Sequence, residues 1–435
     1  MSFLESDIGI GLKFLKQAHQ AYEAAGHVVG MTVVANSLGY KFSQLGLYPR
    51  AMRFYRRSFE NNRAWSIPLS NITNIEIELQ DMDHARQHVA EVRSITKIKF
   101  VMDFVEELAG RIALLDGKPK ATIRHFKSAI KISHDAEPIR EVGELALLGQ
   151  AYLANGNLTA ALKATSQAVK MHRALGFPTV DDHPSQNIWW RHKLVLQANG
   201  KTTEAREALK TAYDFLLHGI ASIQDEGLRR NYLNKVFINR EIVQAWVKEN
   251  AQRKLPKEQL FAHLAHESSL REPFQRLAEI SLELNTLHDV KEIRAFLVEE
   301  ATELSGGERV MLILEKEGKL EVAESLLPRG EDAGKVLTSI RKHLHQARIT
   351  RTTRLIAPNH QSSISNQKSR IIAPLIAQNQ VFGCLYVDMS TLYGTFDETD
   401  RDMLGMLANQ GAVALDNAGL LESLEHKVQE RTAEL

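Results

Sequence analysis

The chain has 435 residues, which corresponds to two or three domains of ordinary size. Its 54 Lys and Arg residues nearly balance its 53 Asp and Glu residues, so the net charge of +1 gives no bulk electrostatic reason to bind nucleic acid. A single cysteine excludes a disulfide scaffold and a Cys-based zinc site. No apolar run approaches the ~18 residues of a membrane span, and acidic Glu5 and Asp7 argue against a signal peptide. We therefore expect a cytoplasmic protein.

Residues 1–250 read as successive amphipathic helices joined by short turns. Two segments place the same kinds of residue at the same spacing: a small residue on a first helix, a glycine in the turn and a small residue on a second helix. They are LGYKFSQLGLYPRAMRFYRRSF and LLGQAYLANGNLTAALKATSQAV. Two antiparallel helices approach closely only where small residues face each other. The small residues expected at these contacts are Gly39, Ala51, Gly110, Gly149, Ala161 and Ala205.

These offsets, repeated over about residues 30–215, resemble the tetratricopeptide (TPR) repeat. The resemblance implies a superhelical array that binds a protein partner on its concave face. Residues 221–250 are expected to form a closing helical pair, because the exposed face of a last repeat is apolar. An irregular helical bundle is the alternative.

Residues 251–273 are interpreted as a linker, because Pro256 and Pro273 flank a stretch of dense charge. After it, the pattern predicts two amphipathic helices, the hairpin RVMLILEKEGKLEVAESLL, an irregular loop, the hairpin SRIIAPLIAQNQVFGCLYVDMS with its turn at Gln378 and Asn379, and a helix that begins near Asp397. This order indicates an α+β domain.

Three segments of this region resemble a GAF domain, the small-molecule or dimerising sensory module of signalling proteins. They are EEATELSGGERVMLIL, APLIAQNQVFGCLYVD and FDETDRDMLGMLANQGAVALDNA, and they span about residues 274–420. The expected fold class is thus multidomain: an all-α TPR-like superhelical array, then an α+β GAF-like domain with a central antiparallel sheet and a C-terminal coiled-coil helix. The expected boundaries are 1–250, 251–273, 274–420 and 421–435.

The last fifteen residues, LESLEHKVQERTAEL, continue the final helix with an apolar seam at heptad spacing. The seam consists of Leu421, Leu424, Val428 and Leu435. It predicts a homodimer through the GAF and C-terminal helices. It also resembles the helix that leads from a GAF domain into a histidine kinase, diguanylate cyclase or nucleotide cyclase domain.

Several residues that suggest chemistry have a simpler interpretation. ANGKTT, which ends at Thr203, lacks the first glycine and the preceding strand of a phosphate-binding loop, and AHESSLREP matches a histidine-kinase acceptor box poorly. The pairs His263 with His266 and His343 with His345 have no further metal ligands at a known spacing, so no metal site is expected. Cys384 lies inside an apolar strand. We therefore expect no catalysis by this chain.

The stretch from Gln346 to Arg370 is basic and contains no acidic residue. By the GAF resemblance it covers a ligand pocket, where Arg side chains with Ser and Thr hydroxyls would hold a small anionic ligand through charge-assisted hydrogen bonds. The candidate ligand-binding residues are Arg348, Arg351, Arg354, Arg370, Ile372, Phe382 and Tyr386. A solvated surface loop is the alternative.

These features together predict a cytoplasmic regulatory protein of signal transduction. Its array would bind protein, and its GAF-like domain would sense a small molecule or dimerise and pass its state to the exit helix. One alternative is the non-catalytic input half of a kinase or cyclase, and another is a pure scaffold whose GAF fold binds nothing.

Overall fold

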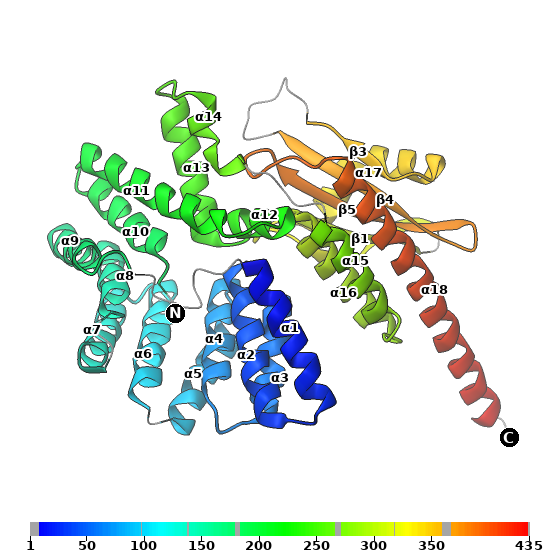
Figure 1. Cartoon of the computed structure of the whole chain (residues 1–435), viewed down its shortest axis with the longest axis horizontal. Coiled ribbons are helices and arrows are strands. Elements are labelled where there is room, and N and C mark those ends of the chain that lie inside the picture. The colour runs from blue at the N-terminus through cyan, green and yellow to red at the C-terminus, as the bar shows by residue number, and fades with distance from the viewer. Residues whose placement is uncertain are drawn as a thin grey trace. The chain divides into compact units, whose positions relative to one another are not determined.

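The computed structural model describes residues 8–96, 98–136, 139–178, 183–265, 271–316, 318–358 and 367–433. Its internal contacts divide the chain into two compact units. The first comprises Met1–Ser222 and Phe237–Ala262, and the second comprises Ile223–Val236 and His263–Leu435. Figure 1 labels the helices and strands of both units.

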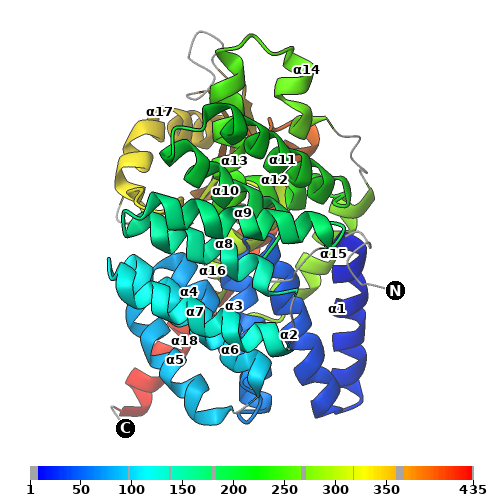
Figure 2. The ribbon, with the colours of Figure 1, turned by 90° about the vertical axis from the view of Figure 1, so that its left-hand side faces the viewer.

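The described part of the first unit is helical. Its helices are α1 (Ile8–Ala24), α2 (Val28–Gln44), α3 (Tyr48–Asn61), α4 (Ile67–Leu79), α5 (Met82–Ile95), α6 (Lys99–Leu115), α7 (Pro119–Ala136), α8 (Glu141–Ala154), α9 (Leu158–Ala174), α10 (Ser185–Ala198), α11 (Thr202–Ala221), α13 (Phe237–Ala251) and α14 (Lys257–Leu260). Consecutive helices from α6 to α11 lie side by side (Figure 2). The prediction of an all-helical N-terminal region is confirmed.

Glycines occupy the closest approaches between paired helices of this unit. A Cβ atom at Gly149 would lie 2.2 Å from Thr165 Cγ2 and 3.2 Å from the Ala161 carbonyl oxygen. A Cβ atom at Gly39 would lie 2.7 Å from the Tyr55 ring, and one at Gly110 would lie 2.5 Å from the Phe126 ring. The alanines at the corresponding positions, Ala51, Ala161 and Ala205, are buried. These contacts explain why small residues recur at these offsets in the sequence.

We expect Gly149→Ala to lower the free energy of unfolding of the first unit by about 1–3 kcal/mol, because the added methyl overpacks the α8–α9 contact. The matched control is Gly11→Ala in α1, where a Cβ atom meets nothing within 4 Å. Thermal unfolding of the full chain, followed by tryptophan fluorescence, reports on this unit because Trp65, Trp189, Trp190 and Trp246 all belong to it. Equal melting of the two variants would contradict the packing described.

A pair of carboxyl groups is buried between α6 and α8. The carboxyl groups of Asp103 and Glu144 are neighbours, and both residues are essentially inaccessible to solvent. Arg140 Nε donates to Asp103 Oδ2 at 2.8 Å, and Ser133 Oγ donates to Glu144 Oε2. Burial, followed by the neighbouring Asp103, raises the pKa of Glu144 to about 10. Glu144 is therefore a neutral, protonated acid at neutral pH.

The second unit is an α+β domain. Its elements are α12 (Glu226–Asn234), α15 (Arg271–Leu284), α16 (Val290–Ser305), β1 (Arg309–Lys316), β2 (Lys319–Leu326), α17 (Ala333–Thr350), β3 (Arg354–Ile356), β4 (Lys368–Ala377), β5 (Gln380–Ser390) and α18 (Glu398–Ala433). The described strands form one sheet in the order β2-β1-β5-β4-β3, and each neighbouring pair is antiparallel. The predicted central antiparallel sheet and C-terminal helix are confirmed.

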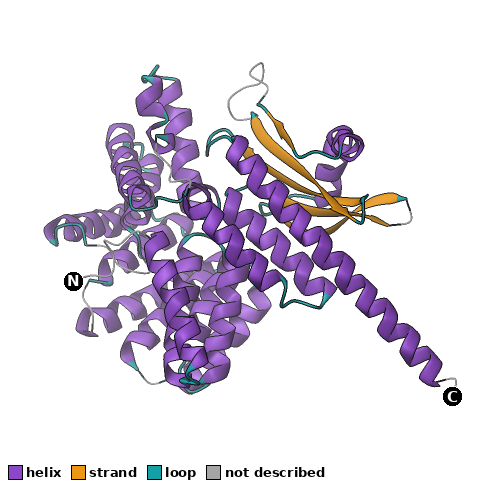
Figure 3. Cartoon of the chain, turned by 45° about the vertical axis from the view of Figure 1, so that its right-hand side comes forward, coloured by secondary structure: helices purple, strands orange, loops and turns teal. Residues whose placement is uncertain are grey.

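Helices cover both faces of this sheet. Figure 3 shows helices on both faces of the sheet, with α17 on one of them. On the α17 face, a sheet row of Met311, Tyr386 and Ile372 packs against α17 through residues such as Ile340 and Leu344. Helices α16 and α18 contact the sheet in the other layer. Apolar side chains of α17 thus fill the middle of its face.

Two elements lie where the sequence predicted an irregular loop. Helix α17 begins at the N-cap Asp332, whose Oδ1 accepts from Lys335 N at 2.8 Å, and its apolar residues Leu337, Ile340 and Leu344 recur at helical spacing. The short strand β3 adds an edge to β4. The loop prediction was therefore wrong for these residues, because apolar side chains at helical spacing over 333–350 pack on the sheet although the end of the segment is basic.

No helix among the described residues is long and apolar enough to cross a membrane.

Candidate functional site

Helix α12 caps the C-terminal end of α16 from outside. The last carbonyl groups of a helix have no partner within it, and the negative end of the helix dipole favours a nearby cation. Side chains of α12 supply both a donor and a positive charge. The bonds run from Asn231 Nδ2 to Thr302 O (2.9 Å), from Asn234 Nδ2 to Gly306 O (2.8 Å) and from Arg230 Nη1 to Ser305 O (3.1 Å).

Two glycines allow this contact. A Cβ atom at Gly227 would lie 2.3 Å from the Leu304 carbonyl oxygen. Gly306 ends α16 with a φ of +65°, and a Cβ atom there would lie 2.3 Å from Arg230 Cβ. Backbone therefore meets backbone at this contact, which a larger residue at either position would separate.

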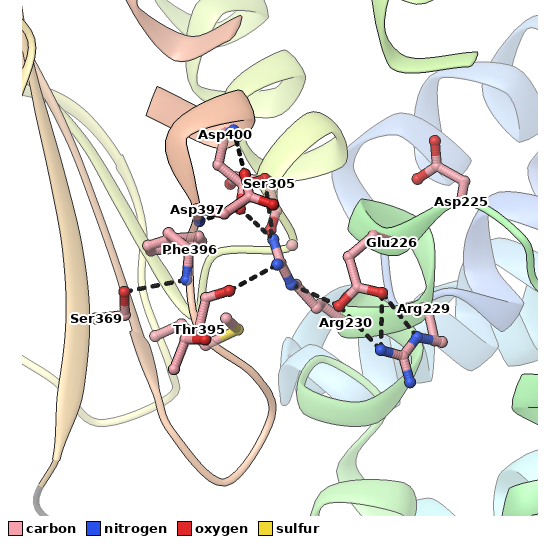
Figure 4. Close-up of polar contacts among 12 residues, drawn as sticks. Asp225, Glu226, Arg229, Arg230, Ser305, Ser369, Thr395, Phe396, Asp397 and Asp400 are labelled. Carbon is pink, nitrogen blue, oxygen red and sulfur yellow. Dashed lines mark hydrogen bonds and ion pairs between the residues drawn. The ribbon is translucent and has the colours of Figure 1, made fainter. Parts of the chain in front are cut away.

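Arg230 also reaches the first turn of the exit helix α18 (Figure 4). That turn is closed by a reciprocal cap, in which Asp397 Oδ1 accepts from Asp400 N at 2.9 Å and Asp400 Oδ2 accepts from Asp397 N at 3.0 Å. Arg230 Nη1 lies 3.0 Å from both carboxylate oxygens of Asp400, and Arg230 Nη2 donates to Thr395 O at 2.8 Å. One guanidinium thus joins the end of α16 to the start of α18.

The charges of Arg230 and Asp400 are buried, and each is compensated by the other. Burial lowers the pKa of Arg230, but Asp400 and Glu226 outweigh that effect and the pKa is raised. Burial raises the pKa of Asp400 to about 6 against the influence of Arg230, so the carboxylate is ionised at neutral pH. Arg230 Nε donates to Glu226 Oε1 at 3.0 Å, which binds the guanidinium to its own helix. The pair is therefore a charge-assisted junction between α12 and α18.

A second charged cluster lies at one end of the α17 face. Asp388 is buried and accepts from Tyr386 Oη at 2.6 Å and from Arg309 Nη1 at 3.1 Å, with Lys368 Nζ at 3.7 Å. Arg370 is the cross-strand partner of Asp388 on β4. Burial raises the pKa of Asp388, and the Arg309 guanidinium acts in the opposite direction. Arg309 also donates through Nη2 to Glu331 Oε1 at 2.6 Å, so the cationic Arg309, Lys368 and Arg370 are balanced here by the carboxylates of Asp388 and Glu331.

Of the arginines predicted to form a ligand pocket, Arg354 and Arg370 both lie near His343 of α17, whose pKa is lowered first by burial and then by their charges, whereas Arg348 and Arg351 have other surroundings. Arg348 is on α17 and pairs with Glu315 of β1. Arg351 Nη1 donates to Asn379 Oδ1 at 2.9 Å, and Arg354 Nη1 donates to Gln346 Oε1 at 2.8 Å. These three contacts fasten α17 to the strands around it. Of the predicted arginines, Arg370 alone stands beside the Asp388 cluster in the described part of the domain.

The apolar candidates lie in the sheet. Ile372 and Tyr386 are cross-strand partners buried beneath α17, and Phe382 is half-buried on β5. Cys384 is buried in the same cluster, and burial raises the pKa of its thiol to about 12. On the exit helix, the side chains of Leu421 and Leu424 are about half exposed at 50% and 57%. Leu435 lies outside the described residues, and for Val428 only the helical backbone is described.

The candidate histidines have separate surroundings. His263 is buried, its Nε2 lies 2.8 Å from Leu392 O, and burial lowers its pKa to about 4. His345 is exposed on α17, and His266 lies outside the described residues. No group of three or more His, Cys, Asp or Glu side chains is arranged to hold a metal ion in the part of the chain that the structure describes.

The comparisons identify the second unit. Residues 289–415 match the family model of the GAF domain. This part of the chain is a GAF domain. No curated protein sequence matches the chain. The GAF domain supports a role in sensing signals.

Solved structures match parts of the chain. The GAF domain of a putative sensor histidine kinase from Pseudomonas syringae pv. tomato matches at 17% identity and a TM-score of 0.27, covering 36% of this chain and 93% of that chain. A methyl-accepting chemotaxis protein fragment matches at 18% identity and a TM-score of 0.28, covering 33% and 98%. YrrB, a TPR protein, matches at 12% identity and a TM-score of 0.27, covering 46% and 91%.

The sequence analysis assigned the residues of α12 to a closing helical pair of the array, whereas Ile223–Val236 belong to the second compact unit. The segment LRRNYLNK places two Arg and two Asn on one short helix, a density of donors that a helix facing only apolar neighbours would not carry. That density is the signal that could have identified a polar interface. The carbonyl groups that α12 contacts lie more than seventy residues further along the chain. Since every residue has a backbone carbonyl group, the sequence does not indicate which ones are contacted.

Proposed function

We propose that this chain is a non-catalytic, cytoplasmic regulator of signal transduction. The helical array binds a protein partner, the GAF domain receives a small anionic molecule, and α18 carries the resulting change onward within a homodimer. The observation that carries the proposal is α18, which begins in the core of a GAF domain and continues to Ala433 with exposed apolar residues.

The exposed residues of α18 favour a dimer. Leu420, Leu421 and Leu424 are each at least half exposed in the single chain. Apolar side chains at this spacing lose that exposure when two such helices pair. The partner helix would be α18 of a second copy of the chain, because the exposed leucines lie on the helix that leaves the GAF domain and each copy presents the same surface.

Light scattering of the full chain at tens of micromolar tests the dimer. We expect the unchanged chain to have twice the mass of Leu421→Glu/Leu424→Glu, because two added charges oppose helix pairing. The matched control is Asn409→Asp, which adds a charge at an exposed position of the same helix. A monomeric unchanged chain, or a dimeric double variant, would refute pairing through this stripe.

The Asp388 cluster favours an anionic ligand. Arg370 is half-buried beside Asp388, which already accepts from Tyr386 and Arg309, and we infer that Arg370 is the cation that an added anion would contact. A cation in a partly desolvated site binds an anion more strongly than one on an open surface.

Native mass spectrometry of the freshly purified full chain shows whether a small molecule is bound. Where one is present, we expect Arg370→Gln to reduce its occupancy by about tenfold, the scale of a charged hydrogen bond. Arg351→Gln is the control, because Arg351 contacts the exposed turn at Asn379. Equal retention by both variants would remove Arg370 from the site, and an empty chain under every condition would favour the scaffold alternative.

A further inference from the structure

Helix α12 is joined to the helical array at both of its ends. The preceding helix α11 ends at Ala221 and α12 begins at Glu226, while α12 ends at Asn234 and α13 begins at Phe237. Helix α13 packs on α11 and α10, where the Tyr213 and Trp246 rings stack with centroids 4.2 Å apart. The two residues between α12 and α13 span at most about 10 Å, so the connection between these helices is short.

The other side of α12 is held by the GAF domain. Its contacts with the α16 carbonyls are made by buried side chains, and Gly227 brings the two backbones together. A displacement of α12 would leave these donors without partners, which is costly in a buried interface. The GAF elements must therefore follow α12, or the buried contacts must break.

Two chains of contacts lead from α12 to the exit helix. Arg230 contacts Asp400 in the first turn of α18 and Thr395 in the loop before it. Arg229 Nη1 donates to His263 O at 2.6 Å, and His263 Nε2 lies 2.8 Å from Leu392 O in the same loop. Neighbouring arginines of one short helix are thus linked to both ends of the segment that connects β5 to α18, Arg230 directly and Arg229 through His263.

We propose that α12 is a coupling helix, through which the conformation of the helical array controls the first turn of α18. The array then acts as an input to the exit helix in addition to any ligand of the GAF domain. The coupling depends neither on a bound ligand nor on pairing of α18. Its failure is therefore distinguishable from failure of the proposed function.

Hydrogen–deuterium exchange of the full chain tests the coupling. Trp246→Ala removes the aromatic stack that holds α13 on α11, and we expect amide exchange in residues 398–404 to become about threefold faster, because α12 transmits the loosening. The same substitution is also made in an interrupted chain, which carries flexible Gly-Ser insertions between Ser222 and Ile223 and between Val236 and Phe237 to uncouple α12 from the array. In that chain, Trp246→Ala should leave exchange in 398–404 unchanged.

The control substitution is Phe14→Ala, which removes an exposed aromatic side chain from α1 and should leave exchange in 398–404 unchanged in both chains. No effect of Trp246→Ala in the uninterrupted chain, or an equal effect in both chains, would overturn the proposal. Where Trp246→Ala unfolds the array, the same comparison is made with Trp246→Phe, which keeps a smaller aromatic ring on Tyr213.

Discussion

Asp400→Ala is expected to lower the free energy of unfolding of the GAF unit by about 3–5 kcal/mol, because it leaves the Arg230 guanidinium buried without its counter-charge. The substitution also removes the side-chain acceptor for Asp397 N at the start of α18. Native-state hydrogen exchange of β1 and β5 amides in the full chain measures the effect. Exchange is preferred to a single melting curve because a chain of two units need not unfold in one step.

Asp402→Ala is the matched control for this prediction. Asp402 lies two residues further along α18, is more than half exposed and pairs with Arg401 at 2.8 Å. A surface pair of this kind contributes at most about 1 kcal/mol. Asp400→Asn should have an intermediate effect, since the amide keeps an acceptor for Asp397 N and loses the charge. Similar losses in Asp400→Ala and Asp402→Ala would show that the junction with Arg230 does not stabilise the unit.

Glu144→Gln is expected to stabilise the helical array at pH 8 by at least about 1 kcal/mol, since one unit of pKa shift corresponds to about 1.4 kcal/mol. The pKa of Glu144 rises from the ordinary 4.5 to about 10 in the folded chain, first because of burial and then because of Asp103. The folded state keeps a proton that the unfolded state releases above pH 4.5. The stability of the unchanged array therefore falls as the pH rises from about 5 towards 10.

The glutamine variant removes that proton linkage. Its amide can donate to Asp103 and its oxygen can accept from Ser133, so the contacts of the buried pair are retained. Tryptophan fluorescence during thermal unfolding at pH 5 and at pH 8 measures the difference, which should be small at pH 5 and large at pH 8. Glu207→Gln, which changes an exposed carboxylate on α11, should show no such dependence. A stabilisation by Glu144→Gln that is independent of pH would contradict a protonated Glu144 in the folded chain.

The parts of the fold that follow from local pattern were predictable. The turn at Gln378 and Asn379 joins β4 to β5 with a positive φ at both residues, as a two-residue hairpin requires. The start of α18 was predicted near Asp397 from its acidic first turn. The first hairpin was also predicted, although Glu317 in its turn lies outside the described residues.

The parts that depend on distant contacts were not predictable in the same way. The basic residues around Arg351 suggested one pocket, but Arg348, Arg351 and Arg354 each find a different partner around α17. Their composition was visible in the sequence, whereas their directions depend on where α17 ends. Likewise, α12 has the ordinary pattern of a helix. The sequence of residues 223–236 does not indicate that they belong to the same compact unit as the GAF domain at 289–415.

The position of α12 has a practical consequence for dissecting or transplanting the sensor. A fragment of residues 274–420 would omit Ile223–Val236, which belongs to the same compact unit. Its α16 would lose the donors of Asn231 and Asn234, and Asp400 would lose its buried guanidinium. Conversely, a fragment that ends at residue 250 would contain α12 without the GAF domain, so the side chains of Arg230, Asn231 and Asn234 would be exposed to water. A chimera that moves the sensor into another protein should therefore carry residues 223–236 with it, as a second piece of a discontinuous domain.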